Sequence, residues 1–233
     1  MNRNSALIWL PKIDALGMPT PKTLMVPYNH NAIIAGMESG KRMDIAPLIR
    51  EVVEVCEEIG WPCFIRTDLG SAKHSGPSAY LADKPTSINR IIYSLVEDQE
   101  LKFWMTGKPP KVFMVRQFLD LDAAFTAFHG LPISREWRFF ADGEKVQCFH
   151  PYWPEDVLKE QNLAEGWDRV LADHHTMPEC FDKLAEMAVM AAGVCGGDWS
   201  VDFAMDKTGK WWLIDMAVKD DSWHWPRCPN GTR

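Results

Sequence analysis

The sequence predicts a mixed α+β fold. Two stretches have the residue spacing of amphipathic helices, and two pairs of apolar segments are separated by short polar turns, which is typical of β-hairpins. The hairpins lie in the C-terminal half, and strands and helices do not alternate regularly along the chain. This order disfavours a doubly wound parallel sheet. The phosphate-binding motifs GxGxxG and GxxxxGK[ST] do not occur in the sequence.

Length and charge limit the classes of protein. The 233 residues form one large domain or two small ones. Twenty-five basic and 32 acidic residues give a net charge of −7, which disfavours nucleic acid or an anionic membrane as the main partner. The first apolar run is too short for a secretion signal, and no run reaches the ~18 apolar residues of a membrane helix. We therefore expect a cytoplasmic protein with no membrane association.

The cysteines form no recognisable ligand motif. The six of them are scattered, with no CxxC pair and no Cys/His spacing typical of zinc sites. This pattern predicts free, buried thiols in a reducing compartment, and it disfavours zinc.

Each element of the N-terminal half is predicted from its local pattern. Residues 5–10 (SALIWL) read as a short strand that Pro11 ends. Residues 44–59 place their apolar side chains on one helical face, with Asp44 as the N-cap and Gly60 just past the end. A compact strand at 63–67, a polar loop at 68–77, a second amphipathic helix at 86–98 and a buried strand at 111–119 follow.

The C-terminal half is predicted to hold two hairpins and one helix. Residues 137–141 and 145–149 pair around Asp142-Gly143, a tight-turn signal. Residues 179–192 form a long apolar helix. The last hairpin joins residues 199–205 to 210–216 through a four-residue polar turn.

Two carboxylates stand inside the apolar strands of the last hairpin. The turn predicts that Met205 pairs with Lys210. Asp202 then faces Leu213, and Asp215 is its diagonal neighbour on the same sheet face, at roughly 7–8 Å between Cβ atoms. That separation suits two acids that share a divalent ion, and without the ion they would repel each other. Alternatively, both acids lie on a solvated face, and a one-residue change of register would separate them.

Basic and acidic residues elsewhere form two further candidate clusters. Arg66 ends a buried strand, and Lys73 lies in the Ser- and Gly-rich loop after it, an arrangement that can collect phosphate oxygens. The alternative is an ordinary surface loop with two solvated cations. In the segment EWRFF, Glu136 and Arg138 share a strand face, where they either bind the ribose and phosphate of a nucleotide or form ion pairs across strands.

The order of these segments resembles the ATP-grasp superfamily, over residues 17 to about 217. Residues 17–23 (GMPTPKT) are similar to the motif that opens this fold. Residues 61–66 (WPCFIR) are similar to its strand P-h-h-h-K-P, where h is a hydrophobic residue, with Arg66 in the place of the phosphate-binding lysine. Residues 112–119 resemble the strand that leads to the adenine-binding hinge, Glu136 resembles the ribose-binding glutamate, and the acids of the last hairpin resemble the paired Mg²⁺ ligands.

Arg66 and the segment 136–140 are similar to a divergent branch, the small ATP-grasp proteins of phages and bacteria. They also resemble the cell division cycle protein family that helps assemble translation initiation factor two. The sequence departs from the usual pattern at Ala217, where ATP-grasp proteins commonly have a metal- or phosphate-binding Asn. Lys219 or Asp220 could compensate for that loss.

The resemblance implies an α+β fold in which two lobes with antiparallel sheets clasp Mg²⁺-ATP. The lobes would span 17–115 and 116–233, and a short strand within 1–16 would leave the usual N-terminal substrate domain nearly absent. The resemblance also assigns roles to particular residues. Catalytic contacts would come from Arg66, Lys73 and Arg138, further ATP contacts from Gln117, Phe118, Leu119 and Glu136, and Mg²⁺ ligands from Asp202 and Asp215.

As the resemblance implies, the reaction would join a carboxylate to an amine through an acyl phosphate, at the expense of ATP. The substrates would be small molecules or peptides, including a protein substrate. An alternative is an ATP-binding, chaperone-like assembly protein of the same fold without ligase activity, which the short N-terminus and Ala217 favour. A third is an interaction module in which the hairpin acids are only solvated.

Overall fold

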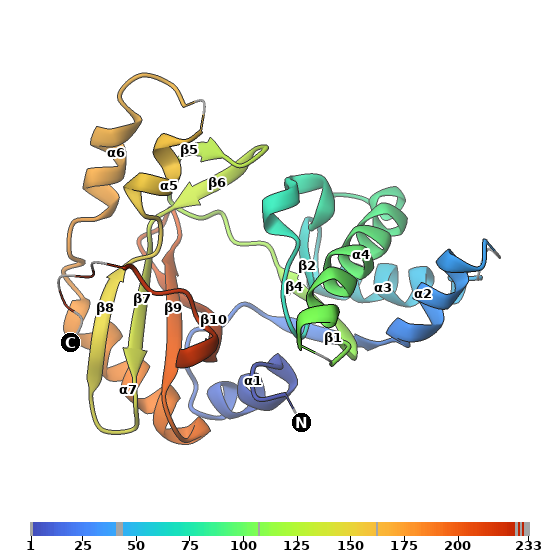
Figure 1. Cartoon of the computed structure of the whole chain (residues 1–233), viewed down its shortest axis with the longest axis horizontal. Coiled ribbons are helices and arrows are strands. Elements are labelled where there is room, and N and C mark those ends of the chain that lie inside the picture. The colour runs from blue at the N-terminus through green and yellow to red at the C-terminus, as the bar shows by residue number, and fades with distance from the viewer. Residues whose placement is uncertain are drawn as a thin grey trace.

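Two four-stranded antiparallel sheets form the centre of the protein (Figure 1). The computed structural model describes residues 2–40, 44–106, 108–161, 163–226, 228 and 230. The first sheet has the strand order β1-β4-β2-β3 and the second the order β10-β9-β7-β8. The strands of the first sheet are β1 (Thr23–Pro27), β2 (Cys63–Thr67), β3 (Leu81–Ala82) and β4 (Val112–Gln117). Those of the second are β7 (Glu136–Ala141), β8 (Val146–Pro151), β9 (Trp199–Met205) and β10 (Trp211–Val218).

Three helices accompany the first sheet: α2 (His30–Glu38), α3 (Ala46–Ile59) and α4 (Ile88–Thr106). The helices predicted at 44–59 and 86–98 are α3 and α4, and the strand predicted at 63–67 is β2. Val52 and Cys56 of α3 are fully buried in a core that also contains the apolar face of α4. The helix begins two residues after Asp44, whose carboxylate accepts a hydrogen bond from the backbone N–H of Ala46 at 3.0 Å.

The predicted strand at 5–10 is wrong, because Ser5 precedes helix α1 (Ala6–Ala15) and residues 6–10 belong to it, with Pro11 inside the helix. Ala6, Trp9 and Ile13 are fully buried, and their spacing is that of a helix face. They pack in the core of the second sheet together with α7 (Phe181–Cys195), the apolar helix predicted at 179–192. Burial of this face outweighs the tendency of proline to end a helix.

A third, smaller core lies beside the two sheets. The hairpin β5 (Ala123–Ala127) and β6 (Leu131–Ser134) packs there with α5 (Glu155–Lys159) and α6 (Trp167–His174). Tyr80, which precedes β3, joins the same cluster as Leu131 and Trp153. This cluster therefore connects the loop after β2 with the second half of the chain.

The predicted boundary between the lobes, at residues 115 and 116, falls inside β4. This strand pairs with β1 and β2 along its length, so Arg116 lies in the first sheet. The division of the chain into the lobes 17–115 and 116–233 otherwise remains a prediction.

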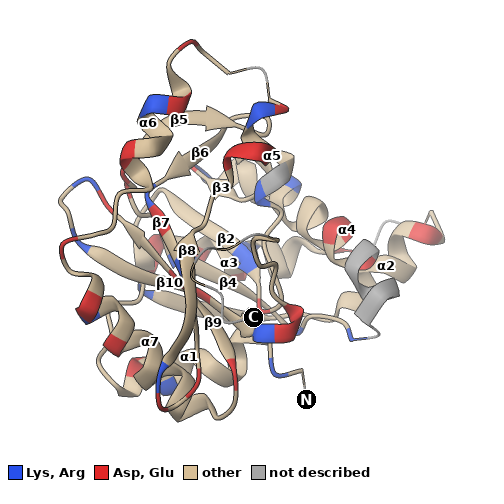
Figure 2. Ribbon diagram, turned by 60° about the vertical axis from the view of Figure 1, so that its left-hand side comes forward, with Lys and Arg blue, Asp and Glu red and all other residues tan. Residues whose placement is uncertain are grey.

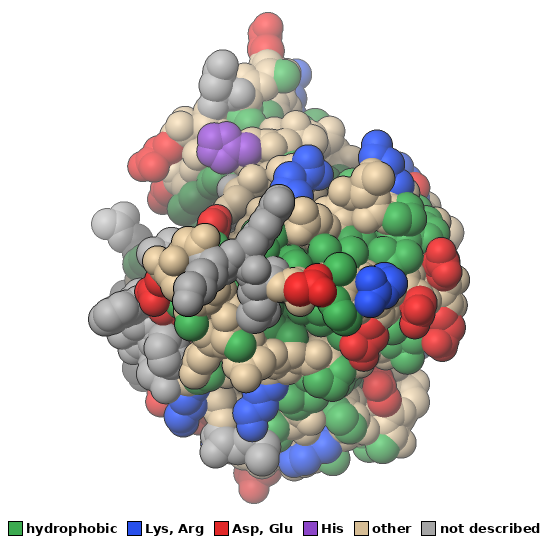
Figure 3. All heavy atoms as spheres, turned by 90° about the vertical axis from the view of Figure 1, so that its right-hand side faces the viewer, with side chains coloured by type: hydrophobic (Ala, Val, Ile, Leu, Met, Phe, Trp, Pro, Cys, Tyr) green, Lys and Arg blue, Asp and Glu red, His purple; other side chains and the backbone are tan. Residues whose placement is uncertain are grey.

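Charges of both signs are spread over the exterior. Acidic residues lie on α4, α5 and α7 (Figure 2). On the face that looks out from the side of α2 and α4, acidic, basic and hydrophobic side chains are interspersed (Figure 3). Within the described residues, none of the helices combines the length and the apolar character needed to cross a membrane.

Candidate functional site

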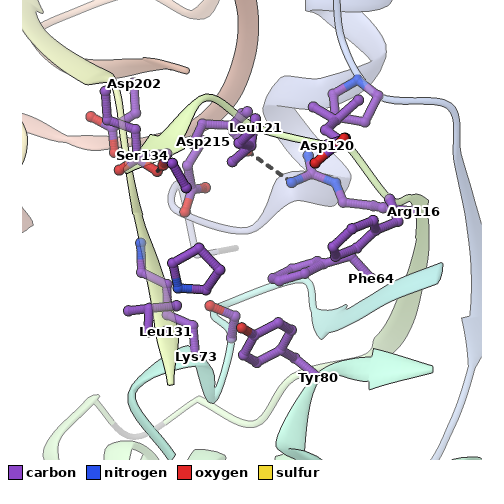
Figure 4. Close-up of a pocket in the computed structure, with 18 of the residues that line it drawn as sticks. Phe64, Lys73, Tyr80, Arg116, Asp120, Leu121, Leu131, Ser134, Asp202 and Asp215 are labelled. Atoms are coloured by element: carbon purple, nitrogen blue, oxygen red, sulfur yellow. Dashed lines mark hydrogen bonds between the residues drawn. The ribbon is translucent and has the colours of Figure 1, made fainter. Parts of the chain in front are cut away.

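A cavity of about 320 Å³ lies between the two sheets. Strands β2 and β4 line it from the first sheet, and β7, β9 and β10 from the second. Figure 4 shows Lys73, Arg116, Asp202 and Asp215 around it, with Phe64, Tyr80 and Leu131 at its apolar part. The cavity thus combines an apolar region with a region rich in charged groups. Of the residues predicted for the site, it is lined by Arg66, Lys73, Gln117, Phe118, Leu119, Glu136, Asp202 and Asp215.

A β-bulge in β10 places the two predicted metal ligands side by side. The hairpin register is one residue different from the predicted one, because Trp211 pairs with Met205. Continued unchanged, this register would set Ile214 opposite Asp202 and turn Asp215 to the other face. The register shifts between Leu213 and Asp215, so that Asp215 lies directly opposite Asp202 on the same face. The predicted diagonal is therefore wrong, whereas the predicted shared face is confirmed.

Each acid is paired with an arginine. Asp202 accepts two hydrogen bonds of 2.7 Å, from Nε and Nη2 of Arg138, its neighbour across β7 and β9. Asp215 Oδ2 lies 2.9 Å from Nη1 of Arg66. Burial acts to raise the pKa of Asp215, but Arg66 and further cations lower it below its ordinary value. The repulsion expected between two unpaired acids is thus absent, because guanidinium groups compensate both charges.

Arg138 has a different position from the one expected for a phosphate ligand. Besides Asp202, its guanidinium donates to the backbone carbonyl of Trp223 at 2.8 Å and lies over the ring of Tyr152 at 4.7 Å. It is not among the described residues that line the cavity. Burial would lower the pKa of Arg138, but Asp202 raises it above the ordinary value. In this conformation Arg138 forms an ion pair with Asp202 across strands, which is the second of the two alternatives that the sequence left open for it.

Lys73 approaches the acids from the short 3₁₀ turn after β2. Its ammonium group lies 4.6 Å from the ring centroid of Tyr152, 5.2 Å from that of Trp153, and 3.4 Å from the hydroxyl oxygen of Tyr152. Burial acts to lower the pKa of Lys73, but Tyr152, Glu136 and the acids of the hairpin raise it above its ordinary value. Lys73 is therefore a cation at neutral pH, and its other N–H groups can reach a ligand in the cavity.

Glu136 offers an unused acceptor to the cavity. The residue is 5% exposed, and its Oε1 accepts a hydrogen bond from the Ser134 hydroxyl at 2.9 Å. Oε2 is buried and has no hydrogen-bond partner among the described residues. Burial raises the pKa of this carboxyl group, and Lys73 limits the rise. A buried polar atom without a partner is costly, so Oε2 is suited to a ligand hydroxyl group.

Arg116 is the site residue that the predicted set lacks. Its Nη1 donates to the carbonyl of Ile214 in the bulge at 2.8 Å, which ties β4 to β10 across the cavity (Figure 4). Its Nη2 is buried without a partner among the described residues. The signal in the sequence is a charged residue inside an apolar strand, which needs a partner. The aromatic residues Tyr152 and Trp153 have no comparable signal, because the sequence does not say that they face Lys73.

The residues suggested as substitutes for the missing asparagine lie elsewhere. Lys219 donates a hydrogen bond to the side chain of Gln147, and Asp220 is exposed in a short 3₁₀ turn. Neither belongs to the described residues that line the cavity.

Comparison with known proteins finds relatives by structure only. No model of a known protein family matches the chain, and no curated protein matches its sequence. Truncated Cdc123 from Schizosaccharomyces pombe superposes with a TM-score of 0.58 at 13% identity, over 93% of this chain and 83% of that one. N5-carboxyaminoimidazole synthase from Aspergillus clavatus, in complex with ADP and 5-aminoimidazole ribonucleotide, gives 0.52 at 11% identity, over 93% and 44%. The protein has the ATP-grasp fold.

The ATP-grasp ligase PsnB, in complex with a minimal precursor, extends this agreement. It superposes with a TM-score of 0.50 at 11% identity, over 99% of this chain and 57% of PsnB. The chain thus spans only about half the length of the ATP-grasp ligases to which it is similar. At identities this low, the structural similarity shows the fold alone. The role of each residue depends on the geometry of the cavity.

The charged region of the ATP-grasp cavity has donors of the kind that Mg²⁺ prefers. Asp202 and Asp215 present hard carboxylate oxygens on one face. Each carboxylate has about four lone-pair sites, so an oxygen that pairs with an arginine can still accept a metal ion. The donor set therefore fits Mg²⁺, which Asp202 and Asp215 would hold.

Proposed function

We propose that this protein is an ATP-dependent ligase that joins a carboxylate to an amine through an acyl phosphate. The observation that carries the proposal is that two charged residues of the cavity each have a buried polar atom, Glu136 Oε2 and Arg116 Nη2, without a hydrogen-bond partner among the described residues. One is a hydrogen-bond acceptor and the other a cationic donor, which matches the hydroxyl groups and the phosphates of a nucleotide. Solved structures of the same fold with ADP bound support the choice of nucleotide.

In this proposal the two regions of the cavity bind different parts of ATP. The base lies among the apolar side chains, beside Gln117, Phe118 and Leu119 at the end of β4. Glu136 Oε2 accepts a hydrogen bond from a ribose hydroxyl. The phosphates lie near Lys73, Arg66 and Arg116, whose positive charges neutralise them.

Asp202 and Asp215 would hold Mg²⁺, which supplies further neutralisation of phosphate charge. Arg138 keeps Asp202 in place through its two hydrogen bonds. The chemistry depends on positioning and charge compensation, so it requires no covalent nucleophile from the protein. The substrates are a carboxylate and an amine of small molecules or peptides, with a protein side chain or terminus included.

Glu136→Gln tests the nucleotide proposal. Hydrogen bonds to charged groups contribute about 1.5–3 kcal/mol, so the variant should bind ATP about 10- to 150-fold more weakly. Because the contact is to ribose, adenosine should lose the same factor. Isothermal titration calorimetry with both ligands measures the two losses, and Glu144→Gln on the exposed β7–β8 turn is the control. Unchanged binding of both ligands would contradict the assignment.

A nucleotide-dependent assembly protein without ligase activity is the second candidate. The match to truncated Cdc123 favours it, because that superposition has the higher TM-score, 0.58 against 0.52 and 0.50 for the two ligases. Incubation with Mg²⁺-ATP and a mixture of peptides separates the two. A ligase releases ADP in proportion to a covalent product that mass spectrometry detects, whereas an assembly protein binds ATP and forms no such product.

A further inference from the structure

Three side chains of types that can bind a metal ion, from two distant parts of the chain, meet at the edge strand of the second sheet. Cys148 lies on β8, and His224 and Cys228 lie on the segment after β10. Sγ of Cys148 is 2.9 Å from Nε2 of His224 and 3.2 Å from Sγ of Cys228. The three ligand atoms all lie within 4.8 Å of one another. The sequence did not predict this group, because the two cysteines are 80 residues apart.

The histidine is oriented as a metal ligand requires. Its Nδ1 lies 2.9 Å from the carbonyl oxygen of Trp225, which can only accept a hydrogen bond, so Nδ1 carries the proton. Nε2 therefore presents its lone pair towards Cys148. A backbone carbonyl on the second ring nitrogen is a common way to fix the tautomer of a ligating histidine. The ring is also packed against Phe140, with 4.8 Å between the ring centroids.

We propose that Cys148, His224 and Cys228 bind a zinc ion. Two thiolates and one neutral imidazole nitrogen form a soft donor set that suits zinc better than Mg²⁺. When the ion binds, two zinc–sulfur bonds and one zinc–nitrogen bond form, and the two thiol protons pass to the solvent. The charge of the two thiolates then balances that of Zn²⁺. A water molecule takes the fourth tetrahedral position.

The zinc ion would fasten the C-terminal segment across the second sheet. That segment also brings the carbonyl oxygen of Trp223 within 2.8 Å of Nη1 of Arg138, the partner of Asp202. Cys148 on β8 and the two ligands on the C-terminal segment would together hold that segment against the sheet. None of the three proposed zinc ligands is among the described residues that line the cavity, so the proposal does not depend on whether the protein is a ligase.

The metal content of the purified chain tests this proposal. The protein is prepared with a reducing agent and loaded with Zn²⁺, and gel filtration removes the excess metal. Elemental mass spectrometry then measures the zinc content per chain. We expect one zinc ion per chain. His224→Asn and Cys228→Ser should each lose it, and Cys148→Ser should as well. Loading with Co²⁺ instead should produce a thiolate-to-cobalt charge-transfer band in the wild type that these variants lack.

Cys180→Ser is the matched control. Cys180 caps α7, where serine is a favoured residue, so this variant should keep both the fold and the zinc. His224 and Cys228 lie outside the strands, and circular dichroism checks that their variants remain folded even if Cys148→Ser does not. Wild type without bound zinc, zinc retained in the His224 and Cys228 variants, or a Cys148–Cys228 disulfide in freshly reduced protein that excludes metal would each overturn the proposal.

Discussion

Arg138→Met tests the ion pair at the centre of the second sheet. Arg138 and Asp202 share two hydrogen bonds of 2.7 Å, and their side chains are only 11% and 6% exposed. Methionine keeps an apolar chain of similar length but removes the charge and all the donors. Asp202 would remain as a buried carboxylate whose charge also acts on Glu136. The variant therefore exposes the cost of an uncompensated buried charge.

The expected loss of stability follows from that burial. Removing one partner of a buried ion pair costs about 3–5 kcal/mol. For a chain of this size, 1 kcal/mol corresponds to about 2–4 °C, so the Tm should fall by about 6–20 °C. Urea unfolding followed by fluorescence of the tryptophans measures the free energy. The double variant Arg138→Met/Asp202→Asn removes both charges and should recover at least half of the loss.

Arg135→Met is the control for this prediction. Arg135 is on the same segment, but its partners Asp122 and Asp173 are 34% and 69% exposed. Arg135 itself is 18% exposed, but the carboxylates that the variant leaves unpaired reach solvent, so the loss should be smaller than in Arg138→Met and nearer to the ~0–1 kcal/mol of exposed pairs. An equal loss in the two single variants, or no recovery in the double variant, would refute the reasoning, because the loss would then not come from an unpaired buried acid.

Three further predictions concern the cavity and the loop that carries Lys73. Arg66→Ala should weaken the binding of ATP much more than that of adenosine in calorimetry, because adenosine has no phosphate to lose; equal losses would make Arg66 purely structural. The pKa of Asp215 lies below its unfolded value, so the contribution of its ion pair to stability is present above about pH 3.9 and is lost as the pH falls through the folded pKa. Asp215→Asn should therefore flatten the acid limb of a stability–pH curve measured by urea unfolding, and an unaltered limb would contradict the pairing. Gly76 has φ +89°, and a Cβ there would lie 3.0 Å from the carbonyl oxygen of His129. Gly76→Ala should destabilise the fold by about 1–3 kcal/mol, whereas a variant as stable as wild type would show that the turn tolerates a side chain.

Local patterns in the sequence determine part of the elements, whereas they predict none of β1, α2, β3, β5, β6, α5 and α6. The apolar periodicity of 44–59 and the short apolar run of 63–67 correspond to α3 and β2, because each pattern matches the period of its element. The prediction for residues 5–10 is wrong because it depends on distant contacts. Its helical face is buried in the core that the second sheet and α7 form, and α7 comes more than 160 residues later, so no local signal outweighs Pro11.

The candidate site divides in the same way. Residue types inside apolar strands identify Glu136, Asp202 and Asp215, because buried charges need partners or ligands whatever the fold. Their partners are determined by the tertiary structure. The bulge at Ile214 decides that the two acids share a face, and Arg66 reaches Asp215 only because the two sheets face each other.

The group formed by two cysteines and a histidine was not predicted from the sequence at all. His224 and Cys228 are close in the sequence, but Cys148 comes 76 and 80 residues earlier, and only the return of the chain after β10 to the edge strand β8 brings the three together. The sequence by itself therefore determined part of the elements, among them α3, α4, α7 and the two C-terminal hairpins, and several charged residues of the cavity. Only the tertiary structure decided which side chains meet, because contacts between distant segments depend on register, bulges and sheet packing that local patterns do not encode.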